Sequence, residues 1–393
     1  MFIRIEEDIL KCVVEEATKG DNNDITNAPA TRCLTECVTA IMRGKHYIYI
    51  PEWIKYRDKL KTILPSYVYN VLQGLSRQDG HALDIVISNK LVVTEDDKAR
   101  DGIMIYSPSC NRTLEIFEES HLICENLNDA NFYEYIQMYY RHQCISKLDK
   151  RSHCCLFKRN GGGSTIDKVI EKESNLGQHL FFVVADSDYK YCLIDKSGKK
   201  EQKYKGAKGE TANKILTVMK KVKKKHPFAN YHIMDEVREI ENLIPSKVLA
   251  KAHPQNDELA KRFICSKDYS YFDVKTGLSV RELLDDKSFN YWTDLLAEDD
   301  IDKDFVSKIR EKYNSKGEYD DAYKSLENDE KSKHKLIIGW GDKILDNILS
   351  KRELSELLEN ISPNDLSDSQ KKEWSEIGKC LFEWGYASIP RMT

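Results

Sequence analysis

The sequence predicts an α/β protein whose core is a parallel four-stranded sheet of Rossmann-like topology, flanked by mainly helical N- and C-terminal regions. Three observations lead to this prediction. From about residue 118 to residue 245, short apolar runs alternate with segments of helical periodicity. Acidic residues or glycines follow each run, as is typical where a strand ends. Helices between successive strands imply right-handed crossovers and a parallel sheet. The predicted strands are His121–Cys124, His153–Phe157, Leu180–Ala185 and Tyr231–Met234.

Three helices are predicted between these strands. Asp129 is expected to open the first, more as a capping residue than as a catalytic one. Ser164 or Thr165 is expected to cap the second, after the glycine run Gly161–Gly163. That run either lets a phosphate approach the backbone or provides a flexible exit from the strand. The third helix is expected over Gly209–Lys225.

The flanking regions have different patterns. The N-terminal part is mainly helical, with short strands expected at Leu83–Ile87 and Leu91–Val93. The C-terminal part is charged and helical, with a polar, solvated joint expected at Lys316–Lys333. Ser367 and Gln370 form a capping box before its last helix. The predicted domains are 1–117, 118–245 and 246–393.

Bulk properties exclude several classes of protein. The chain has 393 residues, of which 40% are hydrophobic, enough for two or three domains with real cores. Its formal charge of -4 gives no general attraction to nucleic acid or anionic membranes. The start MFIRIEEDIL lacks signal-peptide features, and no apolar run approaches ~20 residues, so no membrane association is expected. The eleven cysteines include no CxxC pair and indicate reduced thiols of a cytoplasmic protein.

Two aspartates one residue apart follow the third strand. Asp186 and Asp188 lie where ligands bind in an open α/β sheet, and paired carboxylates are the ligands that Mg²⁺ prefers. Glu125 follows the first strand, where it can act as a general acid or base on a phosphodiester. Glu239 or Glu241, after the fourth strand, would supply a further ligand and allow one or two ions, Mg²⁺ or Mn²⁺.

A lysine-rich segment lies between the third and fourth strands. Residues 199–225 contain 11 lysines and two glutamates, a local charge of +9 in a chain that is negative overall. Such a segment either neutralises phosphates of DNA or RNA or forms a solvated helix face. Arg238 either contacts a phosphate or pairs with a neighbouring acid. The lysines expected to bind nucleic acid are Lys220, Lys221, Lys223, Lys224 and Lys225.

The order of three motifs resembles the Toprim fold as it occurs in OLD-family-like nucleases. The motifs are ICEN (Ile123–Asn126), ADSD (Ala185–Asp188) and REIENLIP (Arg238–Pro245), and the resemblance covers about a third of the chain. It implies a Toprim-like fold, with Glu125 as the general acid or base. It also implies that the two aspartates bind magnesium and that Glu241 is a further ligand.

The chain departs from this family at two points. Asn126 stands where the Toprim pattern usually has glycine, and no GxxxxGK[ST] motif of an ATPase occurs. Stand-alone Toprim-like proteins resemble effectors of bacterial anti-phage systems, which often work with a separately encoded ATPase. The sequence leaves the oligomeric state open, a homo-oligomer included.

Two other functions fit parts of the same pattern. FFVVADSD and LIIGWGDKILD (Leu336–Asp346) also resemble motifs of haloacid-dehalogenase-type phosphatases. In such an enzyme Asp186 would be the nucleophile and Asp188 the acid/base. The other alternative is a non-catalytic Toprim-like module that binds a partner protein.

Overall fold

The computed structural model describes residues 1–19, 27–75, 80–96, 103–110, 115–145, 152–177, 179–189, 192–195, 202–205, 207–253, 255, 257–266, 269–284, 289, 291–292, 303–313, 316–327, 330–331 and 334–388. They form two compact units, each drawn from separated stretches of sequence. Unit 1 comprises Met1–Val184, Ile215–His232 and Glu376–Thr393, and unit 2 comprises Ala185–Lys214 and Ile233–Ser375. The domain boundaries predicted after residues 117 and 245 stay predictions.

The central sheet of unit 1 confirms the predicted α/β class. Its four strands have the order β11-β8-β5-β7. β5 is parallel to both of its neighbours, so that Ile123 faces Arg159 on one side and Val183 on the other. The carboxyl ends of β5 and β8 therefore share one edge of the sheet. The bounds are Ser120–Cys124 for β5, Leu156–Asn160 for β7, Phe181–Ala185 for β8 and Ala229–Ile233 for β11.

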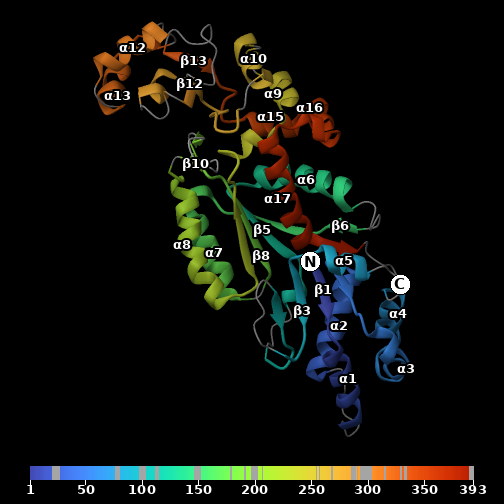
Figure 1. Ribbon diagram of the computed structural model, residues 1–393. Coiled ribbons are helices and arrows are strands. Elements are labelled where there is room, and N and C mark those ends of the chain that lie inside the picture. Colours follow the sequence, from blue (N-terminus) through green and yellow to red (C-terminus); the bar gives the residue numbers. More distant parts are fainter. Residues whose placement is uncertain are drawn as a thin grey trace. The chain divides into compact units, whose positions relative to one another are not determined.

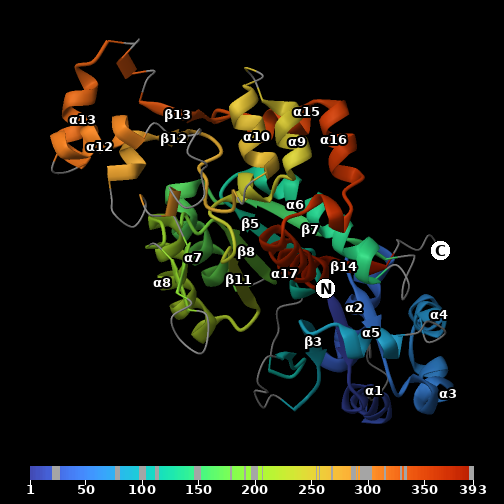
Figure 2. The same cartoon turned by 45° about the horizontal axis from the view of Figure 1, so that its top comes forward.

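Helices cover both faces of this sheet. The views in Figures 1 and 2 show α7 (Ile166–Leu176) and α8 (Glu210–Lys225) side by side on one face, and α6 (Leu127–Tyr140) on the other. Because both faces are covered, all five residues of β5 and of β8 are buried. This explains their continuous apolar runs.

The predicted helix caps need correction. Asn126, rather than Asp129, is the N-cap of α6, and its side chain accepts hydrogen bonds from the N–H groups of Asn128 and Asp129. Asp129 is the third residue of the helix, and its carboxylate accepts the N–H of Asn126 in a capping box. Thr165 stands at the N-cap of α7 without a side-chain cap, because its hydroxyl donates to the carbonyl groups of Gly161 and Gly162.

The predicted second strand is two strands. β6 (Ser152–Cys154) pairs antiparallel with β14 (Tyr386–Ser388), whereas β7 belongs to the central sheet. The break falls at Cys155, whose N–H donates to the Gly385 carbonyl oxygen at 2.7 Å. The apolar run predicted as one strand therefore pairs with β14 through its first part and with β5 through its second part.

The N-terminal region contains a second parallel sheet, which was not predicted. Its order is β2-β1-β3-β4, with bounds Phe2–Ile5 for β1, Tyr47–Tyr49 for β2, Lys90–Val93 for β3 and Met104–Tyr106 for β4. The strand predicted at Leu91–Val93 is confirmed, but the one at Leu83–Ile87 is wrong. Leu83 and Ile87 are buried while Ile85 is 72% exposed, the spacing of a helix. The helices are α1 (Glu7–Lys19), α2 (Pro29–Met42), α3 (Trp53–Ile63), α4 (Ser66–Leu75) and α5 (Gly80–Val86).

Unit 2 is helical with two small antiparallel sheets. One is a hairpin of β9 (Cys192–Asp195) and β10 (Gln202–Lys205), and the other pairs β12 (Gly277–Ser279) with β13 (Lys335–Ile338). The helices predicted after residue 245 are present, but β12 and β13 were not predicted. The joint expected at Lys316–Lys333 includes α13, whose Tyr319 is buried, and residues 328–329 and 332–333 lie outside the described residues. The helices are α9 (Ser246–Ala252), α10 (Glu258–Ser266), α12 (Lys303–Lys312), α13 (Lys316–Lys324), α15 (Ile344–Ser350) and α16 (Arg352–Glu359).

The last helix, α17 (Asp368–Gly385), contributes residues to both units. Its predicted capping box is confirmed, with Ser367 N–H donating to Gln370 Oε1 at 3.0 Å and Gln370 N–H to Ser367 Oγ at 3.2 Å. Across the described residues, no helix is both long enough and apolar enough to cross a bilayer.

Candidate metal centre

Asp186 begins the loop after β8 and is tied to the segment that follows β11. Its Oδ1 accepts a hydrogen bond from the N–H of Ile240 at 3.0 Å. Ser187 reinforces this link through two hydrogen bonds. Its buried hydroxyl donates to the Val237 carbonyl oxygen at 2.8 Å, and its N–H donates to the Arg238 carbonyl oxygen. The carboxylate of Asp186 is thereby held beside Glu239 and Glu241, the neighbours of Ile240.

Asp188 has an unusual backbone conformation. Its φ is +58°, and it is the only non-glycine residue with positive φ in the described part of the chain. Its N–H donates to the Arg238 carbonyl oxygen at 2.9 Å. Its side chain lies against Gly209, where an added Cβ would be 2.6 Å from the carboxylate carbon. Gly209 is therefore required for the present position of the Asp188 side chain.

Glu239 and Glu241 are buried and share a single cation. Glu239 is 5% exposed and Glu241 3% exposed. The ammonium of Lys275 lies 3.1 Å from a carboxylate oxygen of Glu241 and 3.6 Å from one of Glu239. Oε1 of Glu239 is buried and accepts no hydrogen bond from any residue that the structure describes. The cluster therefore contains more carboxylate than its own cation neutralises.

The pKa values of the cluster express this imbalance. Burial, and then the neighbouring Glu241, raise the pKa of Glu239 from 4.5 to about 8. Burial likewise raises the pKa of Glu241. For Lys275, burial favours a lower pKa, but Glu239, Glu241 and Asp186 outweigh it and raise the pKa above the ordinary value. Burial and the proximity of the two carboxylates therefore favour the protonated form of this glutamate pair.

The segment carrying the two glutamates is fixed by side chains from a distant part of unit 2. Asn242 donates through its amide to the carbonyl oxygens of Tyr269 and Phe272. From α17, the Gln370 amide donates to the carbonyl oxygen of Asn242 at 2.8 Å, and Trp374 Nε1 donates to that of Leu243 at 2.9 Å. These bonds support the short 3-10 helix Ile240–Leu243, which Glu239 precedes as N-cap and in which Glu239 and Asn242 form a capping box.

Glu125 lies in unit 1, directly after β5, and is half-buried. Its carbonyl oxygen accepts the N–H groups of Gly162 and Gly163 at 3.0 and 3.2 Å. Both glycines have positive φ, and a Cβ on Gly163 would be 3.9 Å from Glu125 Oε2. These N–H groups bind the Glu125 backbone, so they are not aimed at a phosphate, and the glycine turn instead fixes the base of the Glu125 side chain.

The structure thus brings together part of the predicted site. Asp186, Glu239 and Glu241 meet in unit 2, and Asp188 shares a loop with Asp186. Glu125 belongs to unit 1, so its proximity to these residues of unit 2 stays a prediction. Lys275 was not predicted, because it follows a turn far along the chain and no motif marks it.

The predicted nucleic-acid-binding residues have different surroundings. Lys220, Lys221, Lys224 and Lys225 line one shallow hollow on α8. Lys223 donates instead to Asn230 Oδ1 at 2.8 Å and lies over the ring of Tyr231. Arg238 pairs with Asp273 at 2.8 Å and lines a large cavity of unit 2.

The residues Asp186, Glu239 and Glu241 offer carboxylate donors of the kind that a divalent metal ion binds, but their oxygens do not all lie within 4.8 Å of one another, so the side chains would have to move closer to hold one ion. Carboxylate oxygens are the hard ligands that Mg²⁺ and Mn²⁺ bind. The buried Glu239 oxygen without a hydrogen bond and the excess of carboxylates over ammonium groups would both be relieved by a cation. Asp186, Glu239 and Glu241 are the residues that would hold it.

Comparisons with known proteins found no match. No protein-family model, no curated protein and no solved structure matches the chain.

The pH dependence of stability tests the state of Glu239. Its pKa is about 8 in the folded protein and 4.5 ordinarily, so the folded state binds more protons between these values and stability falls as pH rises through them. Glu239→Gln, which cannot ionise, should remove part of this loss. We expect the free energy of unfolding of the variant to exceed that of the wild type by about 1–3 kcal/mol at pH 8 and to differ little at pH 4.5. Each kcal/mol should raise Tm by roughly 2–4 °C.

The measurement is thermal unfolding from pH 4.5 to 8.5 with EDTA present. Glu210→Gln is the control, because the Glu210 side chain is 83% exposed and pairs only with Lys214 in the same helix. Identical pH profiles for the wild type and Glu239→Gln would contradict the proposed proton on Glu239.

A double-mutant cycle tests the contact between Asp188 and Gly209. Gly209→Ala should destabilise the protein by about 1–3 kcal/mol, because the added methyl group displaces the Asp188 side chain. In an Asp188→Gly background the same substitution should cost less, since glycine tolerates φ of +58° and has no side chain to clash. Denaturant unfolding of the four proteins measures the coupling. Equal losses in the two backgrounds would show that the contact has no role.

Proposed function

We propose that this protein is a metal-dependent nuclease that cleaves phosphodiester bonds of nucleic acid. The observation that carries this proposal is the meeting of Asp186, Glu239 and Glu241 at Lys275, with a buried Glu239 oxygen that has no hydrogen bond. A purely structural role for this cluster is costly, because buried carboxylates without full compensation destabilise a fold. Strain of this kind is typical of functional sites.

In this proposal the three carboxylates hold Mg²⁺ or Mn²⁺. Such an ion, when bound, stabilises the charge on phosphodiester oxygens and lowers the pKa of a water ligand. Asp188 offers a fourth carboxylate from the same loop as Asp186. Lys275 offsets part of the charge of the glutamates, and it also lines a large cavity of unit 2.

Glu125 is the general acid or base in this proposal. Two features support the role: Glu125 follows a strand whose carboxyl end shares an edge with that of β8, and the Gly162–Gly163 turn holds its backbone. A carboxylate fixed in this way can pass a proton between a water molecule and the leaving oxygen. The resemblance of the three motifs to Toprim-like nucleases of the OLD kind supports the same assignment.

The four lysines that line the hollow on α8 are the proposed contact for the nucleic-acid backbone. Their ammonium groups lie on exposed positions of one helix, and the hollow contains no acidic residue. Such a surface binds phosphates without regard to sequence and releases counterions. Lys223 is left out of this surface because it contacts Asn230 and Tyr231.

The biological setting is proposed from the resemblance alone. An effector nuclease of a bacterial anti-phage system, working with a separately encoded ATPase, fits a chain that has Toprim-like motifs and no GxxxxGK[ST] motif.

Substitution of the carboxylates tests the nuclease activity. Asp186→Asn, Glu239→Gln and Glu125→Gln should each lower Mg²⁺- or Mn²⁺-dependent cleavage of plasmid, single-stranded DNA and RNA by a factor of about 100 or more. The controls are Glu210→Gln for unit 2 and Glu134→Gln for unit 1, whose side chains are 83% and 61% exposed. Gel assays with and without EDTA measure the rates, for the protein alone and with the product of the neighbouring gene.

The same proteins separate the alternatives. Absence of metal-dependent cleavage in the wild type would end the nuclease proposal. Hydrolysis of a phosphomonoester that requires Asp186 would favour the phosphatase. Neither activity, together with binding of a partner protein, would favour the non-catalytic module.

Salt dependence tests the lysine surface on α8. The double variant Lys221→Ala/Lys225→Ala removes two phosphate contacts, so the slope of log K against log salt for duplex DNA should fall by about 0.9 for each contact. The matched control is Lys59→Ala/Lys61→Ala, which removes two exposed lysines from α3 in the same unit. Fluorescence anisotropy at several salt concentrations, in EDTA, measures both. Equal slopes for the two double variants would show that α8 is not the contact surface.

A further inference from the structure

The ammonium group of Lys275 lies against two of the carboxylates that would bind a divalent ion. It is 3.1 Å from an oxygen of Glu241 and 3.6 Å from an oxygen of Glu239. These are the distances of an ion pair, whereas Mg²⁺ binds oxygen at about 2.1 Å. Each glutamate would have to approach the ion more closely than it now approaches the ammonium group, and the two cations repel each other. An ion bound by both glutamates would therefore have to replace the ammonium group.

The Lys275 side chain has space to leave the glutamates. It is 31% exposed and lines a cavity of about 690 Å³ in unit 2, which neither Glu239 nor Glu241 lines. Its flexible stem carries a compact charge whose donors can rotate to a new acceptor. Rotation of the Lys275 side chain into this cavity would carry the ammonium group away from the glutamates without a change of the backbone.

Asp342 offers a second acceptor on the wall of the same cavity. The N–H of Gly341, the residue before it, donates to the Lys275 carbonyl oxygen at 2.9 Å. The N–H of Trp340 donates to the Val274 carbonyl oxygen at 2.8 Å. These two hydrogen bonds fix the backbone that leads to Asp342 beside the backbone of Lys275.

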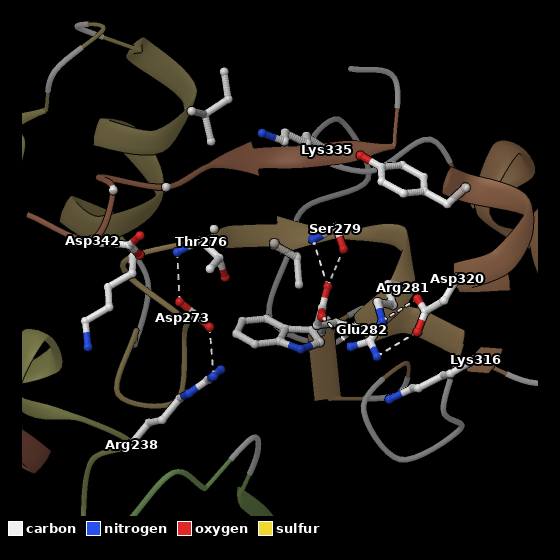
Figure 3. Close-up of a pocket in the computed structure, with 18 of the residues that line it drawn as sticks. Arg238, Asp273, Thr276, Ser279, Arg281, Glu282, Lys316, Asp320, Lys335 and Asp342 are labelled. Atoms are coloured by element: carbon white, nitrogen blue, oxygen red, sulfur yellow. Dashed lines mark hydrogen bonds and ion pairs between the residues drawn. The ribbon is translucent and has the colours of Figure 1, made fainter. Parts of the chain in front are cut away.

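The carboxylate of Asp342 is available for such a contact. Asp342 is exposed, and it forms no ion pair with any residue that the structure describes. Figure 3 shows it on the side of the cavity that carries Thr276, the residue after Lys275. Asp342 is therefore the carboxylate that a displaced ammonium group would meet. The other acids that line the cavity have partners: Asp273 pairs with Arg238, Glu282 with Ser279 and Asp320 with Arg281.

We propose that Lys275 is a displaceable counter-ion of the carboxylate cluster, which exchanges Glu239 and Glu241 for Asp342 when a divalent ion binds. This inference rests on the proposed function, because the ion is that of the proposed metal centre. In the metal-free protein the ammonium group compensates part of the buried charge. In the metal-bound protein its new partner keeps it away from the ion. The affinity for metal then depends on Asp342, although Asp342 is not a ligand.

Binding of Mn²⁺ alone, without nucleic acid, tests this inference. The full-length protein is stripped with EDTA and dialysed, and the free Mn²⁺ is measured by electron paramagnetic resonance during a titration. Asp342→Asn removes the second acceptor and should raise the Kd for Mn²⁺ roughly three- to fivefold. It should leave the Tm of the metal-free protein unchanged, since Asp342 is exposed and has no ion pair among the described residues.

Asp321→Asn is the matched control. Asp321 also belongs to unit 2, is 79% exposed, pairs with Lys324 of the same helix and does not line the cavity. The substitution removes the same charge as Asp342→Asn and should change the Kd for Mn²⁺ by less than twofold.

Removal of the counter-ion should have the opposite effect. Lys275→Met should lower the Kd for Mn²⁺ roughly tenfold, because no internal cation competes for the glutamates. In that background Asp342→Asn should not change the Kd further, since Asp342 acts through the ammonium group. Mn²⁺ should also raise the Tm of Lys275→Met more than that of the wild type. If Lys275→Met does not fold, the comparison of Asp342→Asn with Asp321→Asn still decides.

Three results would overturn the inference. One is an unchanged Kd for Mn²⁺ in Asp342→Asn. Another is an equal effect of Asp342→Asn in the wild-type and Lys275→Met backgrounds, which would be a general effect of the aspartate charge. The third is weaker Mn²⁺ binding by Lys275→Met, which would show that the ammonium group supports the bound ion.

The result for the nuclease proposal is separate. Mn²⁺ binding with the expected pattern, in a protein that cuts nothing, would contradict only the nuclease proposal. Metal-dependent cutting with an unchanged Kd in Asp342→Asn would contradict only this inference.

Discussion

The ion pair of Lys275 with two buried glutamates is the interaction on which the carboxylate cluster of unit 2 depends. A carboxylate removed from water is stable only when a charge or hydrogen bonds replace its hydration, and one ammonium group cannot do this for both glutamates. The folded protein meets this constraint by retaining a proton, which is reflected in the raised pKa of Glu239. A divalent ion would meet it better, because two positive charges and open coordination sites replace one proton. Binding of such an ion would therefore release that proton.

The surrounding structure can be understood as support for this unfavourable arrangement. The segment from Arg238 to Pro245 contains one short 3-10 helix, Ile240–Leu243, whose carbonyl groups accept hydrogen bonds from Gln370 and Trp374 and whose Asn242 side chain donates to Tyr269. Asp186 and Ser187 bind the same segment from the β8 side. Two loops from separate strands are thus fixed to each other and to α17. Rigid support of this kind is what a site needs if its ligands are to converge without help from the ion itself.

Much of the central sheet could be predicted from the sequence, and the reasons are physical. β5 and β8 are buried on both faces, so their residues form short, β-branched and aromatic apolar runs, and the polar residues at their ends locate the sheet edge. The same polar residues at strand ends led to the expectation that Asp186 lies near Glu239 and Glu241. Lys275 could not be predicted, because it reaches the glutamates through tertiary packing that leaves no local pattern. The prediction of a strand at Leu83–Ile87 was wrong because a short apolar run fits the period of a helix as well as that of a strand. That Leu83 and Ile87, four residues apart, are both buried is visible only in the structure.

The interleaving of the two units has a consequence for how the protein is made. β6, which ends at Cys154, has its hydrogen-bonding partner in β14, formed by Tyr386–Ser388. The segment bearing the two glutamates similarly requires Gln370 and Trp374, which the ribosome adds more than a hundred residues later. During synthesis the carboxylates therefore exist for some time without the bonds that hold them together. The carboxylate cluster can be fixed in place only when the chain is nearly finished, because Gln370 and Trp374 are needed to hold it.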